Sequence, residues 1–215
     1  MKLKNVLLLL IAFLVISCEP TTKSDPKENP SGTVTKKTET VPNWTCVPGK
    51  QVGLITSTSN EGDIIFEYGK ENVTRGEIGL GEGIMAEGTI LFPNTENELF
   101  SIWKEDQPFK QIQSIRVRKE GTQWKTAEGI TIGTSLEDLV KINGKDFKFA
   151  GFEWDFAGVV LDWDEGAIDK KLRMYLEPTN EEAIYPDLLG ETTFSTSLPR
   201  AKEAGLKVAS FEINF

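Results

Sequence analysis

Two short segments of this chain, placed 75 residues apart, carry the signals that start, fill and end a helix. The second segment, 134–145, reads TSLEDLVKINGK and sets Thr134 and Glu137 at the spacing of a capping box. In that motif the hydroxyl accepts a hydrogen bond from a free amide of the first turn, while the carboxylate reaches back to the cap. Asn143 and Gly144 follow, and glycine tolerates the left-handed turn that ends a helix. The segment therefore predicts a short, capped helix.

The first segment, 59–70, reads SNEGDIIFEYGK and offers the same parts. Thr58 and Glu61 have the capping-box spacing, and Gly69 stands 75 residues before Gly144. Each segment also has one apolar helical face. The faces consist of Ile64, Ile65 and Tyr68 in the first segment and of Leu136, Leu139 and Val140 in the second. Because such caps are common to many helices, both duplication and coincidence explain the match.

Each predicted helix is followed by runs typical of strands, separated by turn residues. The runs are GTILFP, LFSIWKED and IQSIRVRK after the first helix, and FKFAGFEWDF, GVVLDWDEG, KLRMYL and KVASFEINF after the second. The glycine-rich stretch 76–88 is expected to be a flexible hairpin loop. We therefore expect one α+β domain over 44–215, built from two degenerate helix-plus-antiparallel-meander repeats, about 50–125 and 126–215. These would form one sheet with the helices on one face.

The stretch IGTSLEDLVKINGK combines a glycine, a hydroxyl residue, an aliphatic residue and a closing glycine at fixed spacing. This pattern resembles the helical opening of the small repeats in the outer-membrane lipoproteins called SmpA/OmlA and, in tandem, in beta-lactamase inhibitory proteins. Tandem copies in that group build a long antiparallel sheet with helices packed on one face. The resemblance implies non-catalytic binding across the exposed face of the sheet.

The N-terminus has the pattern of a lipoprotein signal peptide. Residues 1–17 carry Lys2 and Lys4, then a short apolar run, and end at a small residue before Cys18. That run is too short for a membrane-spanning helix, which needs about 20 apolar residues. The tetrapeptide VISC resembles a lipobox, which implies acylation of Cys18 and cleavage before it. The alternative is an ordinary secretory signal with a chance cysteine.

Residues 18–43 are predicted to be a flexible tether between the membrane and the folded domain. They are rich in Pro, Thr, Lys, Glu and Ser and nearly free of large apolar side chains, so they cannot bury enough surface to offset the entropy of ordering. The chain resembles the lipoproteins common in Bacteroidota, which implies a location in the cell envelope. Glu19 is not the aspartate of inner-membrane retention signals, so we expect the outer membrane.

Composition excludes several classes of function. The formal net charge is −9, and loss of Lys2 and Lys4 with the signal would make it −11, which disfavours nucleic acid and anionic lipid as partners. The chain has no histidine, so histidine-dependent nucleophiles and the usual zinc sites are absent. No cofactor is expected. With Cys18 lipidated, Cys46 is interpreted as a small structural residue, and pairing between two chains remains an alternative.

The segment GFEWDFAGVVLDWDEG, 151–166, is the strongest local signal for a hairpin, with a tight turn at Ala157-Gly158. Its expected cross-strand pairs join Phe156 to Val159, Trp154 to Leu161 and Phe152 to Trp163. Those six residues would form a buried face. The opposite face would carry the candidate site residues Glu153, Asp155, Asp162 and Asp164.

In this register Glu153 would lie opposite Asp162, and like charges opposed across a sheet are destabilising. Three interpretations remain: the acidic face is simply solvated, Arg116 and Arg118 lie beside it, or a cation neutralises it. The spacing of Asp162 and Asp164 suits calcium ligands, but the remaining EF-hand ligands are missing and we assign no metal.

We expect the chain to be a lipid-anchored envelope protein. It would act as a non-catalytic binding or structural module, with the membrane as one partner through Cys18 and an envelope protein as another. The enzyme alternative is a metal- or carboxylate-dependent hydrolase that uses the acidic face of the 151–166 hairpin.

Overall fold

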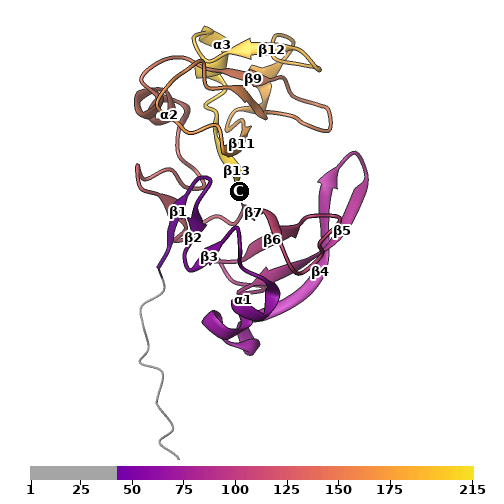
Figure 1. Ribbon diagram of the computed structural model, residues 1–215. Coiled ribbons are helices and arrows are strands. Elements are labelled where there is room, and N and C mark those ends of the chain that lie inside the picture. Colours follow the sequence, from indigo (N-terminus) through magenta and orange to yellow (C-terminus); the bar gives the residue numbers. More distant parts are fainter. Residues whose placement is uncertain (1–42) are drawn as a thin grey trace, which may run out of the picture. The chain divides into compact units, whose positions relative to one another are not determined.

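The largest element of the structure is a six-stranded antiparallel sheet to which early and late segments of the chain both contribute (Figure 1). The computed structural model describes residues 43–215. Across this sheet the strand order is β11-β13-β7-β6-β5-β4. The strands are β4 (Val73–Gly81), β5 (Ile84–Leu91), β6 (Leu99–Trp103), β7 (Ile112–Val117), β11 (Leu172–Glu177) and β13 (Lys207–Asn214).

The remaining strands of the described part form two smaller sheets, so the expectation of one common sheet is wrong. Their orders are β3-β2-β1-β8 and β10-β9-β12. The strands are β1 (Thr45–Val47), β2 (Gln51–Val52), β3 (Ile55–Thr56), β8 (Lys125–Thr126), β9 (Lys148–Ala150), β10 (Val160–Asp162) and β12 (Thr193–Ser195). Each has only two or three residues, because turns interrupt the extended segments. These strands are therefore too short to extend the six-stranded sheet. Strands β1 and β8 pair in parallel, whereas the other described pairs are antiparallel.

Within residues 43–215 the helices are short. They are α1 (Glu61–Tyr68), α2 (Leu136–Asn143) and α3 (Pro199–Glu203), with 3₁₀ turns η1 (Lys70–Asn72) and η2 (Glu181–Ile184). In this part of the chain no helix has both the length and the apolar character needed to cross a membrane. The expected α+β class with mostly antiparallel strands is confirmed.

The two faces of the six-stranded sheet have different roles. The inner face carries a row of fully buried residues across five neighbouring strands: Leu91, Leu99, Val117, Phe211 and Met174. Each buried side chain of this size contributes about 1.5–3 kcal/mol to folding. Ile64 of α1 and Leu139 of α2 belong to the same core. On the outer face the adjacent row is Ile90, Phe100, Arg116, Glu212 and Arg173.

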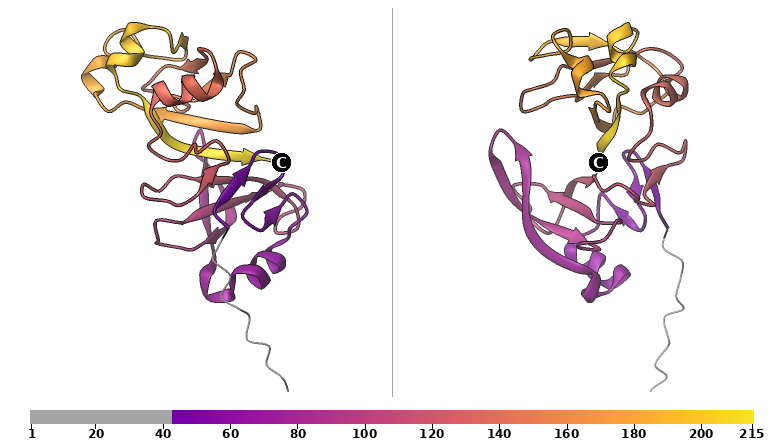
Figure 2. Two further views of the ribbon diagram at one scale, coloured as in Figure 1. Left: turned by 90° about the vertical axis from the view of Figure 1, so that its left-hand side faces the viewer. Right: turned by 180° about the vertical axis from the view of Figure 1, so that it is seen from behind.

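Strands β4 and β5 form a long curved hairpin (Figure 2). Its turn is Glu82-Gly83, with φ values of 51° and 73°, as a two-residue hairpin turn requires. The expectation of a flexible loop over 76–88 is therefore wrong, because most of this stretch is paired strand. Gly88 allows Ile78 to pack closely against β5, since a Cβ there would lie 2.2 Å from Cδ1 of Ile78. Ile78 is 4% exposed in a small cluster on the outer face.

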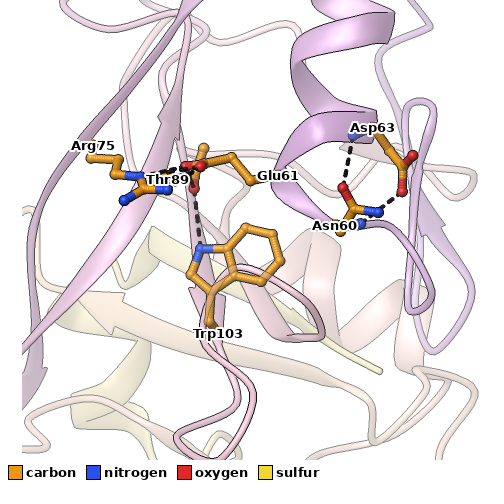
Figure 3. Close-up of polar contacts among 6 residues, drawn as sticks. All are labelled: Asn60, Glu61, Asp63, Arg75, Thr89 and Trp103. Carbon is orange, nitrogen blue, oxygen red and sulfur yellow. Dashed lines mark hydrogen bonds and ion pairs between the residues drawn. The ribbon is translucent and has the colours of Figure 1, made fainter. Parts of the chain in front are cut away.

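Helix α1 occupies its predicted segment, but its cap lies two residues later than expected. The side chain of Asn60, rather than Thr58, accepts a hydrogen bond from the Asp63 amide at 3.1 Å. The Asp63 carboxylate in turn accepts one from the Asn60 amide at 2.9 Å (Figure 3). Glu61 is not the reciprocal partner, because its carboxylate binds elsewhere. Gly69 follows the helix with a φ of 88°.

Helix α2 also follows the prediction, with its cap one residue late. Ser135 rather than Thr134 accepts a hydrogen bond from the Asp138 amide, at 3.1 Å. The carbonyl of Thr134 instead accepts one from the Val208 amide at 2.9 Å, which ties the start of the helix to β13. Gly144 ends the helix in the left-handed conformation.

The segment 151–166 does not form the predicted hairpin. Strand β10 pairs with β9, where Asp162 lies opposite Lys148. Glu153 has a φ of 64°, which an extended strand does not accommodate. The expected pairing of Glu153 with Asp162 is therefore wrong. The predicted buried face forms in part, because Phe152, Val159 and Trp163 are buried but Leu161 is 51% exposed.

Strand β11 determines where this segment lies. The Leu176 amide donates a hydrogen bond to the Gly158 carbonyl at 2.8 Å, and Val159 forms an antiparallel bridge with Tyr175. Gly158 has a φ of 68°, and a Cβ there would lie 2.1 Å from the Leu176 carbonyl oxygen. The loop 151–159 is thus anchored on β11 at a position that only glycine fits.

We expect Gly158→Ala to lower the free energy of unfolding by at least about 2 kcal/mol, because it adds a backbone clash to the cost of a positive φ. Gly190→Ala is the matched control, since Gly190 has a φ of 84° and a Cβ added there would meet nothing within 4 Å. Urea unfolding of both variants measures the difference. Equal losses would show that the loop is not anchored at Gly158.

Candidate functional site

The four acidic residues predicted from the sequence lie on different segments and do not form one face. All four are exposed. Asp162 and Asp164 are brought together, because the Asp164 amide donates a hydrogen bond to the Asp162 carboxylate at 2.8 Å. Glu153 and Asp155 lie in the preceding loop, and Asp155 lines a different cleft from the one that Asp162 lines.

The described residues offer no group of three histidine, cysteine, aspartate or glutamate side chains that could hold a metal ion. Cys46 in β1 is fully buried, and burial raises the pKa of its thiol to about 12. At neutral pH this thiol is therefore protonated and unreactive, which confirms its interpretation as a structural residue. The other predicted site residue, Cys18, lies outside the described residues.

A charged network joins the start of α1 to three strands (Figure 3). The Glu61 carboxylate accepts hydrogen bonds from Nε of Arg75 at 2.9 Å and from the Thr89 hydroxyl at 2.8 Å, and it forms an ion pair with the Arg75 guanidinium. The Trp103 indole N–H donates to the Thr89 oxygen at 3.1 Å. Arg75 also lies 3.7 Å above the ring of Phe109. These groups satisfy one another, so we interpret the network as a structural link.

The outer face presents polar side chains where β7, β13 and β11 lie side by side. Arg116 is opposite Glu212, which is opposite Arg173 on the next strand. Arg116 binds the Glu212 carboxylate at 3.1 Å and donates to the Gly79 carbonyl at 2.6 Å. The Glu212 side chain is only 8% exposed, so its charge needs this partner. The hydrogen bond from Arg116 to Gly79 thereby links β7 to strand β4 of the curved hairpin.

The neighbouring row of the outer face carries hydrogen-bond donors without protein partners. Tyr175 of β11 lies opposite Ser210 of β13. Arg118 follows Val117, whose partner Phe211 is adjacent to Ser210, so Arg118 continues the same row. Within residues 43–215 the side chains of Arg118, Ser210 and Tyr175 make no hydrogen bond or ion pair. Their polar groups are free to bind a ligand.

These three side chains line a cleft of about 220 Å³. Its other walls are Gly79, Leu80 and Gly81 from the hairpin, Arg116 from the sheet, and Asp155 and Phe156 from the loop. Loop and hairpin approach each other here, since a Cβ on Gly81 would lie 3.1 Å from the Phe156 ring. Five separate segments of the chain therefore build the cleft: 79–81, 116–118, 155–156, 175 and 210.

Aromatic rings hold two of the arginines of this face in place. The Arg118 guanidinium carbon lies 4.2 Å from the centre of the Phe100 ring. That of Arg173 lies 5.3 Å from the Tyr175 ring and 5.7 Å from the Phe156 ring. Such stacking orients a guanidinium without using its N–H donors. Partial burial raises the pKa of Tyr175, so its hydroxyl keeps its proton and can donate.

A larger cleft of about 680 Å³ lies beside Arg173. Its walls contain Asp162 and Glu165 as well as Lys170 and Arg173. Two acidic and two basic side chains balance each other there, whereas Arg116 and Arg118 outnumber Asp155 in the smaller cleft. The smaller cleft, with its row of free donors, is the more specific candidate.

The sequence correctly predicted that Arg116 and Arg118 point away from the core, because Ile115 and Val117, which alternate with them, are fully buried. Four residues of the outer face were missed: Arg173, Tyr175, Ser210 and Glu212. A signal existed in KLRMYL, where Arg173 and Tyr175 alternate with apolar residues. No such signal indicated that β13 would lie between β7 and β11.

Glu61→Gln is expected to lower the free energy of unfolding at pH 7 by roughly 1 kcal/mol. The effect is smaller than for a buried ion pair, because Arg75 is half exposed and solvent screens its charge. Arg75, and after it Thr89, hold the pKa of Glu61 below its ordinary value of 4.5 despite partial burial. The carboxylate therefore stabilises the fold above pH 4.5 and loses this effect as the pH falls through the folded-state pKa.

Urea unfolding between pH 7 and pH 3 tests this effect, and the difference between wild type and Glu61→Gln should shrink in acid. Glu137→Gln removes a charge from the first turn of α2, at a residue with no side-chain partner among residues 43–215. This control should follow the wild-type profile to within a few tenths of a kcal/mol. A pH-independent difference for Glu61→Gln would contradict the assignment.

Comparison of the chain with protein-family models, with curated proteins and with solved structures finds no match. What the outer face can bind therefore follows from its own residues. It offers two stacked arginines, two hydroxyl donors and a wall of glycine-rich backbone.

Proposed function

We propose that the folded domain is a non-catalytic binding module that engages a protein partner through the outer face of its six-stranded sheet. One observation carries this proposal: Arg116, Arg118 and Arg173, three of the five arginines in the chain, gather with Tyr175 on the two strands that flank β13, namely β11 and β7 with the residue after it. Arginine and tyrosine are enriched among the residues that contribute most to protein–protein binding. Lysine is the commoner cation of this chain, so the concentration of arginine on one face is selective.

Exposed apolar side chains at the tip of the β4–β5 hairpin favour a macromolecular partner. Ile84 and Met85 are 56% and 55% exposed there, close to the wall of the cleft formed by Gly79 and Gly81. Apolar side chains beside free polar donors match the composition of interfaces, and methionine adapts readily to a partner surface. The resemblance to tandem-repeat proteins that bind across an exposed sheet face agrees with this interpretation.

The proposal includes an anchor at the membrane. The chain would be exported by the signal 1–17, acylated on Cys18 and held in the cell envelope, at the outer membrane, with 18–43 as a tether. The support is the sequence pattern at the N-terminus. Acyl chains contribute about 0.8 kcal/mol per buried CH₂, so two or more chains would hold the domain without direct contact between protein and lipid.

We also propose that the domain contains two degenerate repeats. Helices α1 and α2 begin and end at positions 75 residues apart. Their caps, Asn60 and Ser135, and their third helical residues, Asp63 and Asp138, keep the same offset. Each helix precedes strands that enter the six-stranded sheet. A common ancestral unit explains these shared offsets better than two unrelated helices.

The hydrolase alternative gains no specific support. It would use Glu153, Asp155, Asp162 and Asp164 together, but Asp155 and Asp162 line different clefts. A general acid and a general base must flank one reacting bond. The binding module therefore remains the better proposal.

Site-specific photo-crosslinking in intact cells tests the binding face. A photoreactive amino acid in place of Met85 or Arg173 should give a discrete adduct with a protein partner. Met85 pairs with Gly79 and Arg173 lies over the Tyr175 ring, and both Gly79 and Tyr175 line the cleft. The same amino acid in place of Glu137, exposed on α2, should not. Adducts from Met85 should also weaken when Arg118→Gln is introduced. Equal adducts from all positions, or none from the face, would overturn the proposal.

Metabolic labelling with a fatty-acid analogue tests the anchor. Wild-type protein should incorporate the label and sediment with membranes, because acylation of Cys18 is the expected attachment. Cys18→Ala should lose both properties, whereas Cys46→Ala should keep the label, since Cys46 is buried. Label on the Cys18→Ala variant would contradict the assignment of this residue.

A further inference from the structure

We infer that the cleft between Arg118, Ser210 and Tyr175 binds the carboxylate of a single aspartate or glutamate side chain of the protein partner, an inference that rests on the proposed function. The cleft supplies donors and few acceptors. Arg118 contributes several N–H groups in one plane, while Ser210 and Tyr175 each contribute a hydroxyl. A carboxylate has only acceptors when ionised, so it complements this set.

The arrangement of the donors favours a planar anion. Ser210 lies between Arg118 and Tyr175 along one row, and neighbouring strands are about 4.8 Å apart. Stacking on Phe100 holds the Arg118 guanidinium while its N–H edge remains free. A guanidinium held in this way can form two parallel hydrogen bonds to one carboxylate. The Tyr175 hydroxyl lines the same cleft and is a further donor there.

The size of the cleft indicates a side chain rather than a free metabolite. Its volume is about 220 Å³. Pockets for small molecules usually enclose about 300–1,000 Å³. The cleft also opens beside the exposed residues Ile84 and Met85, which could contact apolar neighbours of the inserted residue. We therefore expect an aspartate or glutamate flanked by apolar residues, presented by a larger partner.

The negative net charge of the chain restricts which partners can approach this face. The chain carries −9 formal charges, so a uniformly acidic partner would be repelled at long range. The outer face differs, because Arg118 and Arg173 have no ion-pair partner among residues 43–215. A single carboxylate in an otherwise neutral or apolar segment avoids the long-range repulsion and can still bind the unpaired arginines.

Asp155 lines the same cleft, and we expect its substitution to strengthen ligand binding, whereas substitution of Arg118 weakens it. A negative charge on a residue that lines the cleft repels a bound carboxylate. Asp155→Asn keeps the shape and removes the charge. It should strengthen binding of an acidic peptide several-fold, whereas the loss of a catalytic carboxylate would bring no such gain.

The test uses the purified full-length chain in detergent and two fluorescent peptides with the cores Leu-Glu-Leu and Leu-Gln-Leu. Anisotropy titrations should show that the glutamate peptide binds about tenfold more tightly, the value of one charge-assisted pair of hydrogen bonds. Arg118→Gln should remove that preference, and Arg118→Lys should retain only part of it. Arg200→Gln, which removes an arginine charge from α3, should leave the preference unchanged.

Equal binding of the two peptides, or no binding of either, would overturn the inference. So would an Arg200→Gln variant that loses the preference as fully as Arg118→Gln, because the effect would then reflect net charge. Circular dichroism and melting temperature establish that the variants are folded. If crosslinks from Met85 persist in cells while the peptides show no preference, the carboxylate inference fails and the binding face remains. If those crosslinks are absent, the proposed function itself fails.

Discussion

Pairing of the last strand, β13, with both β7 and β11 is the interaction on which the rest of the structure depends. Through these two ladders, residues 96 positions apart, Arg116 and Glu212, meet on the outer face. On the inner face the same strand places Phe211 and Ile213 in the core. Without β13, neither the continuous buried row nor the donor row beside the cleft would exist. Both the core and the candidate site therefore depend on contacts between residues far apart in the sequence.

Arginine has two distinct uses in this fold. Arg75 and Arg116 bind partly buried carboxylates, Glu61 and Glu212, and so join separate elements of the sheet and its helix. A buried carboxylate without such a partner would destabilise the fold. Arg118, in contrast, stacks on an aromatic ring and keeps its donors free. Arg75 and Arg116 therefore stabilise the fold, whereas the donors of Arg118 are available to a partner.

Local chemistry was enough to predict the two main helices. Capping residues and the terminal glycines lie within a few positions of each other, so α1 and α2 lie where their patterns indicated. The exact caps were wrong. In α2, Ser135 caps the helix while the Thr134 hydroxyl accepts a hydrogen bond from the Thr131 amide. In α1, Asn60 and Asp63 cap each other while Glu61 binds Arg75 of β4. Sequence spacing alone cannot reveal such a partner.

The segment 151–166 shows where local patterns fail. Alternation of aromatic and acidic residues predicted a hairpin, but the Leu176 amide binds the Gly158 carbonyl, and Lys148 rather than Glu153 faces Asp162. The partners that this segment takes, β9 and β11, lie outside it, so alternation within the segment does not identify them.

By itself, the sequence determined the α+β class, the two capped helices, the outward direction of Arg116 and Arg118, and the acidic charge that disfavours nucleic acid. These properties depend on residue type and on periods of two or 3.6, which are local. Only the tertiary structure decided that Arg118, Ser210 and Tyr175 form one row beside a cleft. That arrangement requires the register of three strands from distant parts of the chain, and register is fixed by packing across the whole sheet.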